Sequence, residues 1–343
     1  MSNSLPGTPL SRRGLLATGG ALGLGALLTA CGDDDGGSGG DGSGASGPWT
    51  FTDDRGKKLK ADKRPERIVA YVSTAAALHD YGVECAGIFG PSEPVDGKPN
   101  PQLGALSPDG LTSLGTAFGD FNIEKYAELR PDLLVSNMFP PPDLWFVPAE
   151  SSKKIARLAP TAGISFAHAS LLEPLKKYEE LAASLGADLQ AAKVTAAKER
   201  FRRAERTLRD AAKAKRGLKV LAMTGDAEQM YVAVPDSYVD LHYFKDLGVE
   251  FVEGKKSDKW GFWEFLSWEN ADKYHADLLL LDNRTAAPSE KDLAEHPVWA
   301  GLPAVKAGQT LPWAMEERCS HLGWAPVVEG LAAALGKAKR LDA

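Results

Sequence analysis

LGADLQAAKVTAAKERFRRAERTLRDAAKAKR, at residues 185–216, reads as one long helix between two similar halves of the chain. Ala, Lys, Arg, Glu and Leu dominate this stretch, and all five are strong helix formers. Neither Gly nor Pro occurs between Gly186 and Gly217, and Gly217 suits the C-terminal cap. Glu199 precedes Arg203 in the favourable i,i+4 order. With a rise of ~1.5 Å per residue, the predicted helix could reach ~45 Å.

The two halves that flank this helix repeat the same order of elements. The first carries PERIVAYV (65–72) and IEKYAELRPDLLVSN (123–137), and the second carries LKVLAMT (218–224) and ENADKYHADLLLLDN (269–283). Each half has a strand, a helix, a Gly-Val-Glu turn, a helix ending near Lys-Tyr, and a wholly apolar strand. Strands that are apolar on both faces belong to parallel sheets covered by helices. We therefore predict an α/β fold with two Rossmann-like lobes, parallel sheets flanked by helices, joined by one long α-helix.

The amino terminus carries the signals of export and anchoring. Arg12 and Arg13 form a twin-arginine pattern, and the apolar run that follows, roughly 17 residues, is short for a membrane span. That run ends in Leu-Thr-Ala-Cys at Cys31, which resembles a bacterial lipobox; the alternative is an ordinary signal peptide with a chance Cys. Gly, Ser and Asp dominate the next segment and favour a flexible tether. The predicted segments are a signal peptide (1–31), a tether (32–48), an N-terminal lobe (49–184), the linking helix (185–216) and a C-terminal lobe (217–343).

Composition narrows the class of protein. The net charge of −6 and the lack of a basic stripe argue against nucleic-acid binding. Beyond the Gly/Ser-rich tether, the mature chain has no G-x-S-x-G, no H-E-x-x-H and no phosphate loop, so we expect no enzyme. The six His are scattered without an H-x-H pair, which argues against direct binding of zinc or manganese. Cys85 and Cys319 are either buried thiols, which we favour, or a disulfide.

Aromatic residues gather at positions expected near a cleft between the lobes. Residues 255–270 read KKSDKWGFWEFLSWEN, in which Trp260 sits in a polar loop while Phe265 and Trp268 are expected in the core. Residues 137–146 read NMFPPPDLWF, where three prolines keep the chain extended. The Trp and Phe that end this run either plug the top of the sheet or form a ligand platform. Ligands of open α/β sheets bind at the carboxyl ends of the strands, so both runs lie where a ligand is expected.

Several motifs together resemble one protein family. The lipobox is followed by PERIV (65–69), the run from Gly115 to Lys125, RPDLLV (130–135), SWEN (267–270) and PVWAGLPAVKAG (297–308). Their order resembles that of the substrate-binding lipoproteins of ABC importers for ferric siderophores, haem and cobalamin. The resemblance covers nearly the whole mature chain. It implies two lobes on a rigid helical backbone, capture of a metal chelate, and delivery to an ABC permease.

The resemblance also implies a ligand and a set of contacts. The Trp-Gly run at 260–267 is similar to a loop of ferric-hydroxamate binders, so a ferric siderophore of hydroxamate type is favoured over haem or cobalamin. Those binders carry an Arg near residues 116–119, where this chain reads Thr-Ala-Phe-Gly, so the cation is expected from Arg284 or Arg318. The predicted ligand contacts are Tyr71, Trp145, Phe146, Tyr231, Trp260, Trp263, Arg284 and Trp313.

The physical reason for such a site lies in the ligand. A siderophore wraps iron with its own oxygens, so the protein supplies aromatic faces and a few donors instead of metal ligands. We expect no permanently bound cofactor, a monomer, and a lipid anchor on the outer face of the cell membrane. The family presents one Glu from each lobe to the permease. Glu150 and Glu290 lie in comparable positions, with Asp143, Asp292 and Glu295 as alternatives.

Overall fold

The structure is a computed structural model that describes residues 47–341 except residues 96, 257 and 286. The predicted signal peptide, the lipidated Cys31 and nearly all of the tether lie outside the described residues. Within the described part, no helix combines the length and apolar character needed to cross a membrane.

The N-terminal lobe is built on a parallel sheet of five strands. In sheet order these are β5 (Thr112–Ser113), β4 (Gly87–Phe89), β3 (Ile68–Tyr71), β6 (Leu133–Met138) and β7 (Thr161–Ser165). Every residue of β3, β4 and β6 is buried, as expected for strands covered on both faces. The other elements of this lobe are the hairpin β1 (Trp49–Thr52) and β2 (Lys58–Ala61), η1 (Pro101–Leu103), α1 (Val72–Asp80), α2 (Ile123–Glu128), α3 (Ser152–Leu158) and α4 (Leu172–Ser184).

The C-terminal lobe has a mixed sheet instead of the predicted parallel one. In order, its strands are β11 (Trp263–Ser267), β9 (Gln229–Ala233), β8 (Lys219–Gly225), β12 (Leu278–Asp282) and β13 (Thr310–Trp313), with β10 (Glu250–Phe251) beside β8. β9 pairs antiparallel with both β8 and β11. The cause is a three-residue turn after β8, in which Asp226 Oδ1 accepts from the backbone N–H groups of Glu228 and Gln229.

Several short helices and the 17-residue α10 complete the C-terminal lobe. They are η2 (Pro235–Ser237), α6 (Val239–Asp246), η3 (Trp268–Lys273), α7 (Glu290–Leu293), α8 (Pro297–Gly301), α9 (Pro303–Lys306) and α10 (His321–Lys337).

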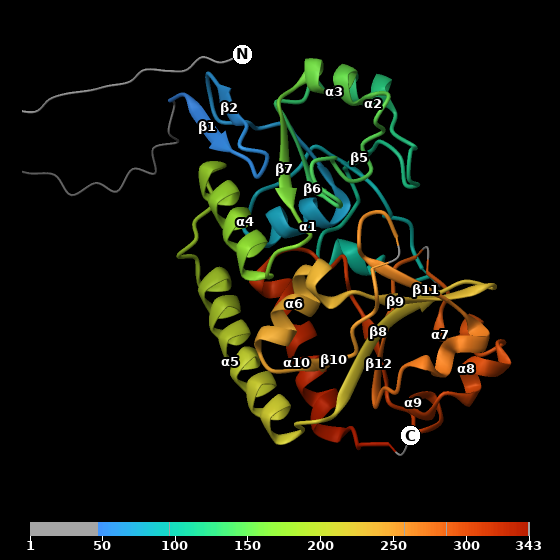
Figure 1. Cartoon of the computed structure of the whole chain (residues 1–343). Coiled ribbons are helices and arrows are strands. Elements are labelled where there is room, and N and C mark those ends of the chain that lie inside the picture. The colour runs from blue at the N-terminus through green and yellow to red at the C-terminus, as the bar shows by residue number, and fades with distance from the viewer. Residues whose placement is uncertain (1–46, 96, 257, 286, 342–343) are drawn as a thin grey trace, which may run out of the picture. The chain divides into compact units, whose positions relative to one another are not determined.

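The long helix is shorter than predicted. The expected helix over residues 185–216 is α5 (Ala192–Ala214), and the chain before it forms turns. Gly186 has φ +92°, a left-handed conformation that follows the end of α4, and Gly217 with φ +85° follows α5. Figure 1 shows α5 running beside α10, with α4 above it.

The contact between α5 and α10 combines apolar and ionic parts. Phe201 of α5 is buried and meets His321 of α10 edge-on at 5.2 Å between ring centroids. Arg200 donates two hydrogen bonds, of 2.8 and 2.6 Å, to the carboxylate of Glu329. One cluster of buried apolar side chains runs through both lobes, from Trp49 to Ala338. The lobes are therefore packed on one another and on this helix pair.

Candidate ligand-binding site

A cavity of about 1110 Å³ lies between the lobes, at the carboxyl ends of strands from both sheets. The N-terminal lobe contributes the loop after β6, from Phe139 to Glu150, together with Phe118. The C-terminal lobe contributes residues around Trp260 and, after β12, Arg284. The volume lies just above the range for small-molecule sites, about 300–1,000 Å³, and suits a large ligand.

Exposed aromatic side chains mark the cavity from both lobes. Phe118 is 70% exposed, Trp260 is 52% exposed and Phe265 is 45% exposed, although large apolar side chains are usually buried. Phe118 packs on Trp145, with ring centroids 5.4 Å apart. We call Phe118, Trp260 and Phe265 the aromatic rim. These rings offer apolar surface that a bound ligand would cover.

The loop that carries Trp145 is tied back onto strand β6. The backbone N–H of Trp145 donates to the carbonyl of Asn137 at 2.7 Å, and the hydroxyl of Ser136 donates to the carbonyl of Trp145 at 2.8 Å. The peptide bonds before Pro140 and Pro142 are cis. This bonding fixes the Trp145 backbone at the mouth of the parallel sheet, where Trp145 forms part of the cavity wall.

The loop that carries Trp260 is organised by one carboxylate. Asp258 accepts hydrogen bonds from the backbone N–H groups of Trp260 at 2.9 Å and Trp263 at 2.7 Å. Gly261 has φ +77°, which a residue with a side chain rarely adopts, and it lets the loop turn directly after Trp260. The Trp260 ring consequently projects into the opening, with Lys259 Nζ 4.1 Å from its centroid.

Phe265 corrects one expectation from the sequence. The sequence predicts a core position for it, but β11 is an edge strand whose residues alternate between buried and outward positions. Glu264 and Leu266 point inward, so Phe265 must point outward. Trp268 is buried as expected.

Arg284 brings a cation to the cavity and is held by two acids. Its Nε donates to both carboxylate oxygens of Asp282 at 3.0 Å, and its Nη2 donates to Asp282 at 2.7 Å. Its Nη1 donates to Glu316 Oε1 at 3.0 Å. Burial opposes the charged form, but the charges of Glu316 and Asp282 outweigh it and raise the pKa of Arg284 above its ordinary value.

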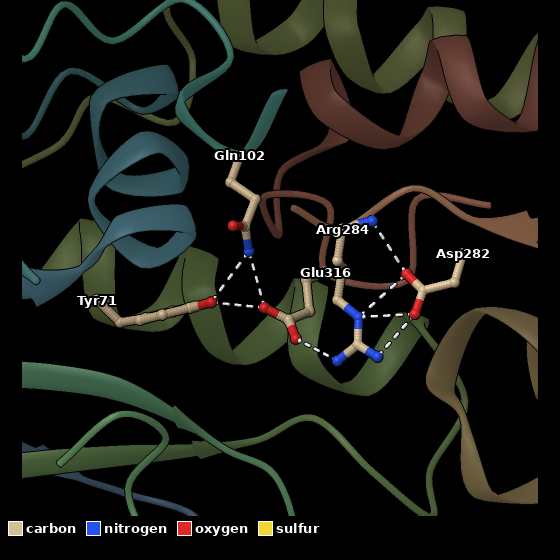
Figure 2. Close-up of polar contacts among 5 residues, drawn as sticks. All are labelled: Tyr71, Gln102, Asp282, Arg284 and Glu316. Atoms are coloured by element: carbon tan, nitrogen blue, oxygen red, sulfur yellow. Dashed lines mark hydrogen bonds and ion pairs between the residues drawn. The ribbon is translucent and has the colours of Figure 1, made fainter. Parts of the chain in front are cut away.

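Side chains of the N-terminal lobe form hydrogen bonds to Glu316, as Figure 2 shows. Tyr71 at the end of β3 donates its hydroxyl hydrogen to Glu316 Oε2 at 2.5 Å, and Gln102 Nε2 donates to the same oxygen at 2.7 Å. Burial and then the charge of Glu316 raise the pKa of Tyr71 well above its usual value, so the hydroxyl stays protonated. A continuous chain of polar contacts thus runs from one lobe to the guanidinium in the other.

The structure brings four of the eight predicted ligand contacts to the cavity wall: Trp145, Trp260, Trp263 and Arg284. The other four do not line it. Tyr71 and Trp313 are buried, and Trp313 Nε1 donates to Asp240 Oδ2 at 2.6 Å. Phe146 packs between Tyr71 and Phe118, at 5.3 Å from each ring. Tyr231 packs on Phe265 at 5.1 Å and donates its hydroxyl hydrogen to Asp226.

The remaining predicted residues are placed as follows. Glu150 lines the cavity edge, whereas Glu290 opens α7 and accepts a hydrogen bond from Thr310 at 3.0 Å. Arg318, the alternative cation, is bound to Asp80 at 2.8 Å and to Glu317 at 2.6 Å. Cys85 and Cys319 are buried free thiols.

Phe118 is a cavity residue that the sequence analysis missed. Its turn was noted only because it lacks an Arg. A Cβ atom at Gly115 would lie 1.6 Å from the carbonyl oxygen of Asp120, so this turn closes only with glycine there. Gly119 has φ +83° on the other side. A large aromatic residue in a short glycine-flanked turn is the signal that could have identified it.

Comparison with known proteins agrees with this arrangement. A family described as periplasmic binding proteins matches residues 70–313. The chain is similar to the solved structure of DesE, a ferric-siderophore receptor protein from Streptomyces coelicolor, with 46% identity and a TM-score of 0.82 over 86% of this chain and 100% of that one.

Two curated relatives from Bacillus subtilis are more distant. The iron(3+)-hydroxamate-binding protein FhuD is 24% identical over 84% of this chain and 86% of its own length. The Fe(3+)-citrate-binding protein YfmC is 23% identical over 82% of this chain and 84% of its own length. With the family match spanning most of both lobes, the chain belongs to the periplasmic binding protein family, whose members are binding proteins and not enzymes.

Proposed function

We propose that this protein binds a ferric siderophore, with the hydroxamate type favoured, and delivers it to an ABC permease. The observation that carries the proposal is the cavity of about 1110 Å³, whose rim exposes Phe118, Trp260 and Phe265. A pre-formed metal chelate has a broad apolar periphery, and aromatic faces bury such a surface at low cost in side-chain entropy.

The polar part of the cavity suits the oxygens that surround the iron. The side chain of Arg284 is 24% exposed and lines the cavity, so its free N–H groups can donate to ligand oxygens. The siderophore keeps its own iron ligands in this picture, and the protein binds the outside of the complex.

The relatives support the class of ligand. DesE is described as a ferric-siderophore receptor, FhuD as a hydroxamate binder and YfmC as a citrate binder. The 46% identity to DesE makes a ferric siderophore the preferred ligand. Among siderophores, the Trp260 loop favours the hydroxamate type, while haem and cobalamin are the alternatives within the class.

Delivery requires the protein to stay near its permease. We propose that Cys31 carries the lipid anchor on the outer face of the membrane and that residues 32–48 act as a tether. Glu150 and Glu290 come from different lobes and are the proposed contacts with the permease.

Titration of intrinsic Trp fluorescence tests the proposal directly. A ferric trihydroxamate should quench the emission at sub-micromolar concentration, since Trp145, Trp260 and Trp263 line the cavity. The iron-free hydroxamate and haem should have little effect in the same range. Quenching by haem or cobalamin instead would select the alternative ligand, and no response to any ferric chelate would contradict the proposal.

A further inference from the structure

The guanidinium of Arg284 is an unusual cation because two carboxylates already neutralise it. Asp282 binds its Nε and Nη2, and Glu316 binds its Nη1 at 3.0 Å. Both acids are almost wholly buried, so water screens their charges weakly. A ligand approaching Arg284 therefore meets a group whose immediate surroundings carry more negative than positive charge.

The same guanidinium still offers hydrogen bonds. A guanidinium carries five N–H donors. The contacts to Asp282 and Glu316 leave one N–H on Nη1 and one on Nη2 without an acceptor among the described residues. The side chain is 24% exposed and lines the cavity. Arg284 is thus a donor of directed hydrogen bonds that brings little net positive charge.

The position of Glu316 is fixed from the opposite lobe. Tyr71 and Gln102 both donate to its Oε2, and Figure 2 shows the carboxylate between them and Arg284. Because these donors hold Glu316 on the guanidinium, an incoming anion cannot take its place without breaking buried hydrogen bonds. The neutralisation is therefore built into the contact between the lobes.

The other charges on the cavity wall do not restore a positive field. Arg55 is bound by Asp53 at 2.6 Å. The remaining charged side chains are of both signs: Lys57, Lys153, Asp143, Glu150 and Asp258. Clefts of a single sign concentrate oppositely charged ligands, and this cavity has no such excess of cations among its described residues.

We propose that Asp282 and Glu316 are specificity-determining residues that make the site select electrically neutral or cationic ferric chelates and reject polyanionic ones. The inference rests on the proposed function and narrows its ligand. Three singly charged hydroxamates cancel the charge of Fe³⁺, whereas three doubly charged catecholates leave a trianion. The trianion would lose its hydration in an aromatic cavity and face two fixed carboxylates. A neutral complex would accept hydrogen bonds from the two free N–H groups without that cost.

A charge-resolved binding experiment tests the inference. The probes are a neutral ferric trihydroxamate and a ferric tris-catecholate of similar size, titrated by Trp fluorescence or calorimetry. For the wild-type protein we expect the Kd of the catecholate complex to exceed that of the hydroxamate complex by about a hundredfold. In Glu316→Gln and Asp282→Asn, which each remove one negative charge, that ratio should fall about tenfold.

Glu329→Gln is the matched control. It makes the same carboxylate-to-amide change at an Arg–Glu pair between α5 and α10, and it should leave the ratio unchanged. Asp282→Asn acts within one lobe, so it remains informative if Glu316→Gln disturbs the contact between the lobes.

The outcomes separate the two proposals. If neither ferric complex binds the wild-type protein, the proposed function fails. If the tris-catecholate binds as tightly as the trihydroxamate, or if the ratio stays constant in both variants, the siderophore function stands and the charge inference is overturned. A ratio that falls equally in Glu329→Gln would also overturn it, because the effect would then reflect overall charge.

Discussion

Two regions between the same two lobes are built in opposite ways. The aromatic rim of Phe118, Trp260 and Phe265 is exposed. Elsewhere, buried ion pairs and hydrogen bonds connect the lobes. We call this second region the polar seam; it consists of Tyr71, Asp80, Gln102, Glu316, Arg318 and Ser320. The rim leaves apolar surface uncovered, while the seam pairs buried polar and charged groups across the lobe contact.

The difference indicates which region governs ligand binding and which governs stability. An exposed aromatic side chain adds little to folding but gains apolar contact when a ligand covers it. A buried ion pair is costly to break, because the remaining partner is left unpaired in a poorly hydrated place. Changes at the rim should therefore alter mainly affinity, and changes at the seam mainly stability, apart from Glu316, which also binds Arg284 of the cavity.

Removal of Asp80 breaks the seam without touching the rim, although it also removes an ion pair with Lys193 of α5 at 3.9 Å. Its Oδ2 accepts from Arg318 Nε at 2.8 Å and from the Ser320 hydroxyl at 2.6 Å. Asp80→Ala leaves the mostly buried guanidinium of Arg318 with Glu317 as its remaining ion-pair partner. We expect the free energy of unfolding to fall by about 3–5 kcal/mol. The midpoint of chemical denaturation measures this change.

Glu329→Gln is again the control, because it breaks a solvent-exposed Arg–Glu pair. Its cost should stay below about 1 kcal/mol. Equal losses in the two variants would mean that burial does not distinguish the seam from an ordinary surface pair.

Asp240, which accepts a hydrogen bond from Trp313, should make the free energy of unfolding depend on pH. Burial raises the pKa of Asp240 to about 7, although the hydrogen bond from Trp313 opposes the shift. An acid whose pKa is raised on folding binds more protons in the folded state. Its contribution to stability is therefore complete below the pKa of the unfolded chain, near 3.8, and is lost as the pH rises to 7.

The variant Asp240→Asn removes this titration but can keep the acceptor for Trp313. The free energy of unfolding of the variant minus that of the wild type should increase by about 2 kcal/mol from pH 5 to pH 8, because only the wild type loses stability over this range. Denaturation of both proteins at the two pH values gives the difference. A constant difference would show that Asp240 does not titrate across this range.

The rim should respond in affinity. Trp260→Ala and Phe118→Ala each remove a ring that a ligand would cover, at a cost of about 1.5 kcal/mol or roughly tenfold in Kd for the ferric chelate. Because both rings are largely exposed, the free energy of unfolding should change by less than about 0.5 kcal/mol. Calorimetric titration and denaturation measure the two quantities.

Val298→Ala, at an exposed apolar residue away from the cavity, is the control and should leave Kd unchanged. If the rim variants lost affinity only when they also lost stability, the rim side chains would belong to the folded core. The contrast between the rim and the seam would then disappear.

The fold could be predicted from the sequence because its signals are local and repeated. The buried strands β3, β6 and β12 consist mostly of apolar residues. A run of consecutive apolar residues in the sequence is enough to identify such strands. The start of α5 was missed because composition favours a helix from Leu185 onward. Helix propensity does not reveal that Gly186 turns the chain through φ +92°.

The site was harder to predict than the fold, because the position of a residue along a strand does not show on which face of the sheet its side chain lies. Tyr71 and Trp313 end strands β3 and β13, as a site at the carboxyl edge requires, but both side chains are buried behind the cavity wall. The hydrogen bond between Tyr71 and Glu316 joins residues 245 positions apart. No local pattern encodes such a pair; it depends on how the two lobes pack.

Tyr231 gives the smallest expected effect and locates the boundary of the rim. Its ring packs on Phe265 at 5.1 Å, while its hydroxyl donates to Asp226 in the turn between β8 and β9. Tyr231→Phe keeps the ring and removes only this surface hydrogen bond. We expect less than about a twofold change in Kd and a stability loss below about 1 kcal/mol. If the same variant weakened binding tenfold in calorimetry, its hydroxyl would have to contact the ligand. The cavity would then extend past Phe265 to strand β9. The rim would include a polar hydroxyl group, and the contrast between an apolar rim and a polar seam would no longer hold.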